Sequence, residues 1–164
     1  MLQIITRTLL RDLSRQAAES ERLRINHNIH QSYQEPCQRL VNALEPGTYI
    51  RPHRHLTPPK PECFVAISGR MAAVTFGDQG EIERVLVIGT QEEALGVDIP
   101  PGTWHAVVAL AHGSAFFETK PGPYEPLSDK DWAPWAPAEG SLAAPAYLAD
   151  LERRVRASLG EIDG

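Results

Sequence analysis

The chain has 164 residues, of which 42% are hydrophobic and 23% charged, as expected for one ordinary globular domain spanning residues 1–164. Its 16 basic and 21 acidic residues give a formal net charge of −5, which argues against nucleic acids and anionic membranes as partners, because both need a basic face. No apolar run approaches the ~20 residues that span a bilayer. The N-terminus becomes charged too early for a signal peptide, so a cytoplasmic location is expected.

The first part, residues 1–36, is predicted to contain one helix followed by an irregular segment. Apolar residues recur at helical spacing between charged and amide side chains, which predicts a helix over residues 4–22: Leu9, Leu10, Leu13 and Ala17. Residues 24–36 are polar and dense in Asn, His and Gln, which is unusual for a linker. They are neither strongly helical nor typical of a plain loop.

Residues 37–120 have the pattern of short strands separated by Gly and Pro, and are predicted to form a β-barrel. The segment 77–80, Gly-Asp-Gln-Gly, is the strongest turn signal and predicts a hairpin. About eight strands at this spacing are typical of a β-sandwich or barrel rather than of βαβ units. The expected strands are residues 38–44, the segment that carries His53 and His55, and residues 62–67, 71–76, 82–88, 94–99, 104–110 and 114–119.

The last part, residues 121–164, is predicted to be a Pro-rich segment followed by a C-terminal helix. The Pro-rich segment should pack over the barrel, because Tyr124, Trp132 and Trp135 would otherwise be exposed apolar surface. The helix is expected to begin near Pro145 and to end near Gly160. Its apolar side would consist of Leu148, Leu151, Val155 and Leu159.

The two cysteines are expected to be buried free thiols. Cys37 and Cys63 form no CxxC pattern, and each lies in or beside an apolar segment. This placement favours a packing role over a disulfide or a reactive nucleophile.

Three histidines and one glutamate are spaced as a metal site would require. His53 and His55 are one residue apart in an extended segment, so their side chains point to the same face. Glu62 follows a proline-rich bend that can return it alongside them, and a Pro-Pro-Gly turn precedes His105. Imidazole and carboxylate groups suit Zn, Fe(II), Mn or Ni. We therefore predict that one divalent metal ion is the cofactor.

The catalytic candidates are His27, His30 and Glu62. The two histidines can form part of a pocket wall and transfer protons near neutral pH. Alternatively, they hold the N-terminal segment in place through hydrogen bonds to the backbone. Glu62 is a metal ligand or, beside an open His₃ site, either a group that orients a ligand or a base.

The substrate-binding candidates are Arg51, Lys60 and Tyr49. Arg51 shares the face of His53 and can bind an anionic group of the substrate, with Lys60 as a weaker candidate for the same role. Tyr49 is expected to lie in the core or in the pocket wall rather than to act as a catalyst.

Two motifs resemble those of the cupins. The pattern Gly47-x5-His53-x-His55 followed by Glu62-x6-Gly69 resembles the first cupin motif, although its central span is longer than usual. The run Pro100-Pro101-Gly102-x2-His105 resembles the second motif, in which Ala109 replaces the usual Asn.

The wider context resembles the cupin-fold metalloproteins of the WbuC type, within the RmlC-like cupin superfamily. The resemblance covers most of residues 24–120 and includes the runs 24–30, 33–39 and 49–55 with Glu62. It implies a double-stranded β-helix, or jelly-roll barrel, that holds a divalent metal and is usually dimeric. It also implies a link to bacterial O-antigen and other surface-polysaccharide clusters, without a settled reaction.

Three functional hypotheses follow. The first is a metal-dependent enzyme acting on a small sugar-derived substrate by isomerisation or epimerisation, or as an Fe(II) dioxygenase if the metal is iron. The second is a non-catalytic module that binds a sugar or an anion with help from the metal. The third is a purely structural metal. The expected partners are a small-molecule ligand and a second copy of the chain.

Overall fold

The structure is a computed structural model that describes residues 2–161. This part of the chain contains two α-helices, one short 3₁₀ helix and eight strands. In chain order they are α1 (Arg7–Glu19), β1 (Arg24–Asn28), β2 (Cys37–Leu44), β3 (Glu62–Ser68), β4 (Arg70–Phe76), β5 (Ile82–Gly89), β6 (Gly96–Ile99), β7 (Trp104–Ala109), β8 (Ser114–Pro121), η1 (Asp129–Asp131) and α2 (Ala144–Ser158). Within residues 2–161 no helix is long and apolar enough to cross a membrane.

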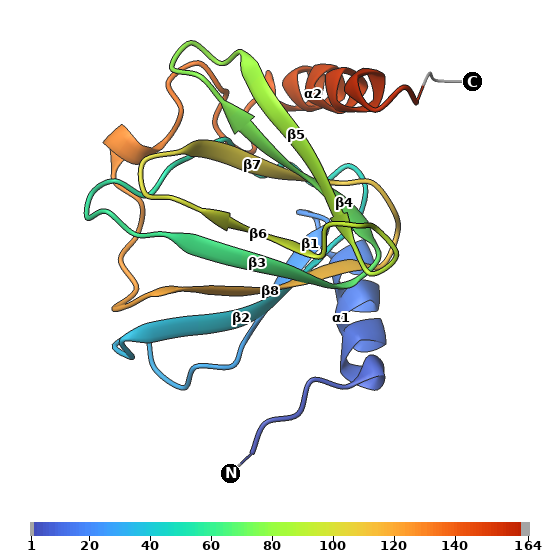
Figure 1. Cartoon of the computed structure of the whole chain (residues 1–164), viewed down its shortest axis with the longest axis vertical. Coiled ribbons are helices and arrows are strands. Elements are labelled where there is room, and N and C mark those ends of the chain that lie inside the picture. The colour runs from blue at the N-terminus through green and yellow to red at the C-terminus, as the bar shows by residue number, and fades with distance from the viewer. Residues whose placement is uncertain (1, 162–164) are drawn as a thin grey trace.

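The strands form two antiparallel sheets that face each other (Figure 1). The larger sheet has the order β1-β2-β8-β3-β6, and the smaller one has the order β5-β4-β7. Strands far apart in the sequence are neighbours, as β2 and β8 are, because the chain crosses repeatedly from one sheet to the other. This arrangement is the mainly β jelly roll predicted from the sequence.

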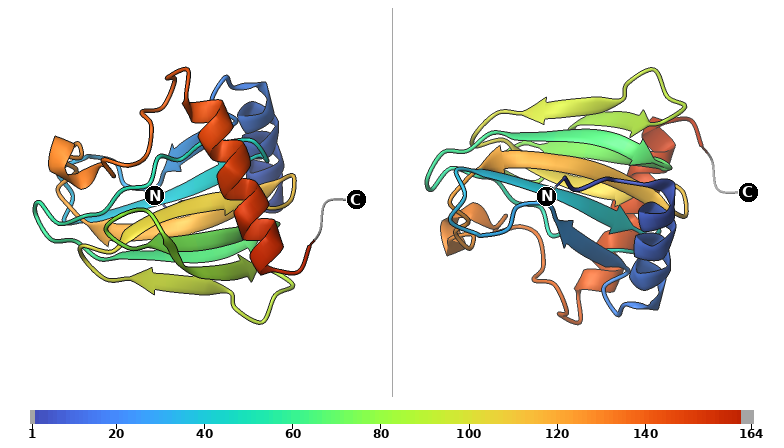
Figure 2. Two further views of the ribbon diagram at one scale, coloured as in Figure 1. Left: turned by 90° about the horizontal axis from the view of Figure 1, so that it is seen from above. Right: turned by 90° about the horizontal axis from the view of Figure 1, so that it is seen from below.

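Each sheet is covered on its outer face by one helix, as the two views in Figure 2 show. Leu13 and Ala17 of α1 pack against Val41 and Ala43 on the outer face of β2. On the other side of the molecule, apolar residues of α2 pack against β4 and β7. The outer faces therefore bury apolar side chains under helices, and the space between the sheets holds a second core that includes Phe64, Met71 and Phe116.

The inner face of the larger sheet becomes polar toward β1. Side chains alternate along β2, so that Leu40, Asn42 and Leu44 point inward while Val41 and Ala43 point to α1. A strand that buries an amide on its inner face needs a polar partner there. The polar end of this sheet is where the candidate site lies.

The N-terminal elements differ from those predicted. Helix α1 is shorter than residues 4–22, because the Oγ1 of Thr6 accepts the N–H of Leu9 at 3.1 Å and caps the helix, which ends before Ser20. Strand β1 lies in the segment to which no element was assigned. Its register, from Arg24 opposite Leu44 to Asn28 opposite Leu40, shows that pairing with β2 makes it a strand.

The segment around His53 and His55 is extended, but it is not a strand within either sheet. It makes isolated bridges from His53 to His105 and to Trp132. The cysteines are free, as expected, but Cys37 is exposed and Cys63 is half-buried. Cys37 begins β2 opposite Pro121, at the end of the sheet, where no element covers it.

Replacement of Leu151 by Ala should destabilise the protein by about 2–5 kcal/mol, because this side chain is 2% exposed between α2 and the smaller sheet. Urea denaturation followed by circular dichroism measures the change. Leu142→Ala is the matched control, since Leu142 is fully exposed and its loss should change the free energy of unfolding by less than about 0.5 kcal/mol. Equal effects of the two substitutions would contradict the packing of α2.

Candidate metal centre

His53 lies in an extended segment held between β7 and the C-terminal part of the chain. Its N–H donates to the carbonyl of His105 at 3.0 Å, and the N–H of His105 donates back at 2.8 Å. On the other side, the segment forms a bridge to Trp132, and the N–H of Ala133 donates to the carbonyl of Pro52 at 3.0 Å. Backbone pairing on both sides therefore fixes the position of the His53 side chain.

The proline-containing loop between His55 and Glu62 brings the Glu62 side chain back beside His55. The N–H groups of Lys60 and Gly102 both donate to the His55 carbonyl, at 3.3 and 3.1 Å, and so close this loop. Glu62 is the first residue of β3 and is 3% exposed, and one of its carboxylate oxygens contacts the Nε2 of His55. The structure thus brings the carboxylate beside the histidines, as the sequence predicts.

Two of the histidines are anchored through Nδ1, which leaves Nε2 as the nitrogen that faces the other members of the cluster. The Nδ1 of His53 lies 3.0 Å from the carbonyl of Arg51, and the Nδ1 of His105 lies 2.8 Å from the carbonyl of Thr103. A carbonyl only accepts, so each Nδ1 carries a proton, and Nε2 is the nitrogen that can bind a metal. Metal-binding imidazoles are commonly oriented in this way by an acceptor on the other nitrogen.

Four potential ligand atoms lie within 4.8 Å of one another, one from each predicted metal residue: His53, His55, Glu62 and His105. The Nε2 atom of His105 is buried and makes no hydrogen bond within residues 2–161, and it lies 3.4 Å from the Oε2 of Glu62. A lone pair that faces a carboxylate oxygen is repelled unless a proton or a cation lies between them. The four residues therefore fit a divalent ion, with a donor set suited to Zn, Fe, Mn or Ni.

The pKa values of His53 and Glu62 favour the protonation states that bind metals. Burial, together with the neighbouring His105, lowers the pKa of His53 to about 3, so this imidazole is neutral near pH 7. Burial alone would raise the pKa of Glu62, but His105, His55 and the ammonium of Lys120 outweigh it and hold that pKa well below its usual range. The cluster thus combines neutral imidazole with an ionised carboxylate.

Lys120 and Glu118 belong to the site, although the sequence motifs do not single them out. The Nζ of Lys120 lies 2.9 Å from the Oε1 of Glu62 and 2.7 Å from the Oε1 of Glu118. Glu118 also accepts a hydrogen bond from the Nδ2 of Asn42 at 2.7 Å. The sequence pattern that could have identified them is the two-residue alternation of β8. It places Glu118 and Lys120 on the inner face that Phe116 also occupies.

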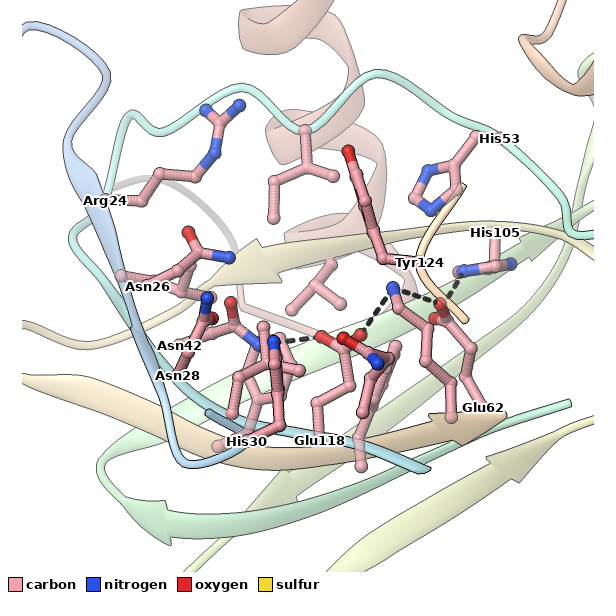
Figure 3. Close-up of a pocket in the computed structure, with 18 of the residues that line it drawn as sticks. Arg24, Asn26, Asn28, His30, Asn42, His53, Glu62, His105, Glu118 and Tyr124 are labelled. Atoms are coloured by element: carbon pink, nitrogen blue, oxygen red, sulfur yellow. Dashed lines mark hydrogen bonds and ion pairs between the residues drawn. The ribbon is translucent and has the colours of Figure 1, made fainter. Parts of the chain in front are cut away.

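The cluster lies at one end of a cavity of about 540 Å³ inside the jelly roll (Figure 3). Figure 3 shows His53, His105 and Glu62 on one side, with asparagine side chains from β1 and β2 opposite them. A cavity of this size is within the ~300–1,000 Å³ that is typical of small-molecule sites. The polar lining beyond the metal cluster consists of Arg22, Arg24, Asn26, Asn28, His30, Tyr33, Gln38, Asn42, Glu118, Lys120 and Tyr124.

His30 reaches this cavity, whereas His27 is not among its lining residues. Asn26 and Asn28 face the cavity, so alternation along β1 turns His27 to the opposite face. That face also carries Ile25, which packs with the apolar residues of α1. The expectation that His27 belongs to the pocket wall is corrected by this placement.

Arg51 and Tyr49 are engaged in packing rather than in lining the cavity. The guanidinium of Arg51 donates to the carbonyl of Ala133 at 2.9 Å and lies 5.5 Å from the centre of the Trp132 ring, within the range of a cation–π contact. Tyr49 is 8% exposed, and its hydroxyl donates to the carbonyl of Pro137 at 2.8 Å. The predicted substrate-binding roles of these two residues are therefore corrected: both hold the C-terminal segment on the barrel.

Lys60 lies near the metal cluster but outside the main cavity. It borders a second cavity of about 420 Å³, to which His53 and His55 also contribute. Its ammonium donates to the carbonyl of Pro123 at 2.7 Å and lies 4.0 Å from the carboxylate of Glu125. Lys60 thus remains a candidate only for the outer edge of the site.

Structural comparison places this fold among known proteins. The chain is similar to a conserved protein of unknown function, SPY1581 from Streptococcus pyogenes, with a TM-score of 0.50 and 13% identity over 76% of this chain and 91% of that one. It is similar to CapF, crystallised with the inhibitor 3-isopropenyl-tropolone, with a TM-score of 0.50 and 20% identity over 62% of this chain and 28% of that one. It also matches an RmlC-like cupin from Desulfovibrio desulfuricans, with a TM-score of 0.46 and 16% identity over 60% of this chain and 81% of that one. At these identities the likeness concerns the fold.

The fold is a jelly roll, and a candidate metal centre lies inside it. The family model described as "Domain of unknown function (DUF6016)" matches residues 5–88, about half of the chain. The chain therefore belongs to the DUF6016 family. No curated protein matches it.

Protein purified without added metal or chelator should contain close to one divalent ion per chain, measured by elemental analysis. His53→Ala and His105→Ala should each lose the ion, because each removes one of the four converging donors. His112→Ala is the control, since the His112 side chain is 88% exposed and pairs with Glu45 away from the cluster. Trace metal at the same level in all four proteins would contradict the metal centre.

Proposed function

We propose that this chain is a metal-dependent cupin enzyme that isomerises or epimerises a small sugar-derived metabolite. The observation that carries the proposal is the position of the metal-ligand candidates: three of the four, His53, Glu62 and His105, line one end of a polar cavity inside the jelly roll. A purely structural metal would need no such cavity beside it. An enclosed cavity with a few converging polar groups is the usual form of a small-molecule site.

The chain also supplies a second buried carboxylate as the candidate general base. A divalent ion held by the cluster would supply polarisation of a carbonyl or hydroxyl oxygen of the substrate. Glu118 lies in the same cavity and is not one of the four ligand candidates. Burial raises the pKa of Glu118 against the opposing charge of Lys120, which moves this carboxyl toward the range of an effective general base.

The resemblance to WbuC-type cupins supports a substrate drawn from surface-polysaccharide metabolism, of the O-antigen kind. A cytoplasmic location is part of this proposal, since both cysteines are free thiols, as is usual in a reducing compartment.

Metal-loaded protein should catalyse exchange of the C2 hydrogen of a sugar in deuterated water. The probes are glucose, mannose and galactose, and proton NMR measures the loss of the C2 signal. Glu118→Gln should reduce the exchange rate by about 100-fold or more while the metal content is unchanged, because the amide cannot accept the proton. Glu93→Gln, on the exposed surface, is the matched control and should exchange at the wild-type rate.

If the protein binds a sugar but catalyses no exchange, its function is that of a metal-assisted binding module rather than an enzyme. If the iron-loaded protein takes up oxygen, the proposed reaction is that of a dioxygenase rather than an isomerisation. Full activity in Glu118→Gln would overturn the role of that residue alone.

We further propose that the chain forms a homodimer through the outer face of its larger sheet. Val65, on β3, is 41% exposed and lies beside Ile67, Phe117, Ile5 and Leu10 around one broad hollow between the sheet and α1. Contiguous apolar side chains of this kind are typical of protein interfaces.

Light scattering after size exclusion should therefore give the mass of two chains. Val65→Lys should shift the protein toward one chain, because it places a charge in the apolar contact. Leu142→Lys, at a fully exposed residue elsewhere, should leave the mass unchanged. A wild-type protein with the mass of one chain at tens of micromolar would rule out the dimer.

A further inference from the structure

The wall of the cavity that faces the candidate metal centre has no role in holding the metal. It is formed by β1, by β2 and by the segment between them, and its polar side chains appear together in Figure 3. Two of these side chains, His30 and Gln38, each contain a buried polar atom without a partner in the described part of the chain. Their protonation and orientation can be derived from their other contacts.

His30 presents a hydrogen-bond donor to the cavity. Its Nδ1 accepts the N–H of Arg39 at 3.1 Å. The carbonyl of Arg39 also lies 3.0 Å from this Nδ1, but it already accepts the N–H groups of Ile29 and His30, at 2.8 and 3.3 Å. Since one N–H cannot donate to another, the proton of the imidazole lies on Nε2. This Nε2–H belongs to a side chain that is 7% exposed and lines the cavity, and it has no acceptor.

Gln38 presents a hydrogen-bond acceptor to the same cavity. Its Nε2 donates to the carbonyls of Glu35 at 2.9 Å and Tyr33 at 3.3 Å, which fixes the orientation of the amide. Its Oε1 is therefore the free atom, in a side chain that is 1% exposed. A buried donor and a buried acceptor without partners cost folding free energy, and a ligand hydroxyl can satisfy either of them.

The remaining groups in this wall also suit hydroxyl groups. Asn26, Asn28 and Asn42 line the cavity, and an amide can both donate to and accept from a hydroxyl. Tyr33 and Tyr124 border the same cavity, with ring centres 5.0 Å apart and about half of each side chain exposed. Their apolar faces suit the C–H surface of a ligand whose edges are polar.

The lysine and arginines that line the cavity are already paired with acceptors. Arg24 lies 2.7 Å from the carboxylate of Glu139 and donates to the carbonyl of Tyr49 at 2.9 Å. Arg22 lies 2.8 Å from the same Glu139 carboxylate. Lys120 is held between the two buried carboxylates described above. A phosphate group needs uncommitted cationic donors, and this wall offers none among its lining residues.

We propose that the wall formed by His30, Gln38 and the three asparagines binds the hydroxyl groups of an uncharged part of the ligand. The ligand is then a free sugar or a sugar acid, not a sugar phosphate or a nucleotide sugar. The inference rests on the proposed function, because it takes the metal centre as the second anchor of the same ligand. His30 is the residue that selects for a hydroxyl acceptor at this position.

Calorimetric titration of the protein with its ion bound tests the inference. The probes are the free hexose, the hexuronate and the hexose 1-phosphate of the gluco, galacto and manno series. At least one free hexose or hexuronate should bind, and the phosphate of the same series should bind at least tenfold more weakly.

His30→Asn keeps an acceptor for the Arg39 N–H, and its shorter side chain places no donor at the position of the His30 Nε2. It should weaken binding of the free sugar about three- to tenfold, the usual effect of one hydrogen bond. His27→Asn is the matched control, because it makes the same change on the opposite face of β1, and it should leave the affinity unchanged.

Three results would overturn the inference while the ion is still bound: equal or tighter binding of the 1-phosphates, no binding of any hexose or hexuronate, or an unchanged affinity in His30→Asn. Failure of the proposed function is recognised separately, since elemental analysis would then find no ion in the wild-type protein, or the bound sugar would show no C2 exchange.

Discussion

The site depends on the burial of one carboxylate. Glu62 is 3% exposed, and an ionised group so far from water is tolerated only where donors or cations surround it. Its partners come from three places in the chain: His55 from a loop, His105 from β7 and Lys120 from β8. The two sheets must therefore close on each other before this charge is balanced, so that closure of the jelly roll and assembly of the site are one event.

The two helices allow the interior to be polar. Because α1 and α2 cover the outer faces of the sheets, much of the apolar burial occurs outside the space between the sheets. The inner face of β2 and β8 can then carry Asn42, Glu118 and Lys120, which form a continuous row of hydrogen bonds and ion pairs ending at Glu62. Such a row is stable only when every member is paired, which explains why these side chains are held so closely.

Apart from the segment that carries His53 and His55, the strands of residues 37–120 are predictable from the sequence, as is the convergence of the metal cluster, because turn residues and two-residue alternation act locally. Strand β1 is not, since its Asn and His residues have low β-propensity and only pairing with β2 makes it a strand. Arg51 illustrates a different limit. Alternation placed it on the face of His53, but the segment lies in neither sheet, and Trp132 and Ala133 determine where the side chain goes.

The bridges that join His53 to both His105 and Trp132 have a thermodynamic consequence. The four donors span 52 positions of the chain, from His53 to His105, so an unfolded molecule offers no comparable set. The free energy of binding an ion would therefore add directly to the stability of the fold. A chelator would then act on this protein as a denaturant does. The segment containing Trp132 would loosen with the barrel, because it is held through the same residue that holds the ion.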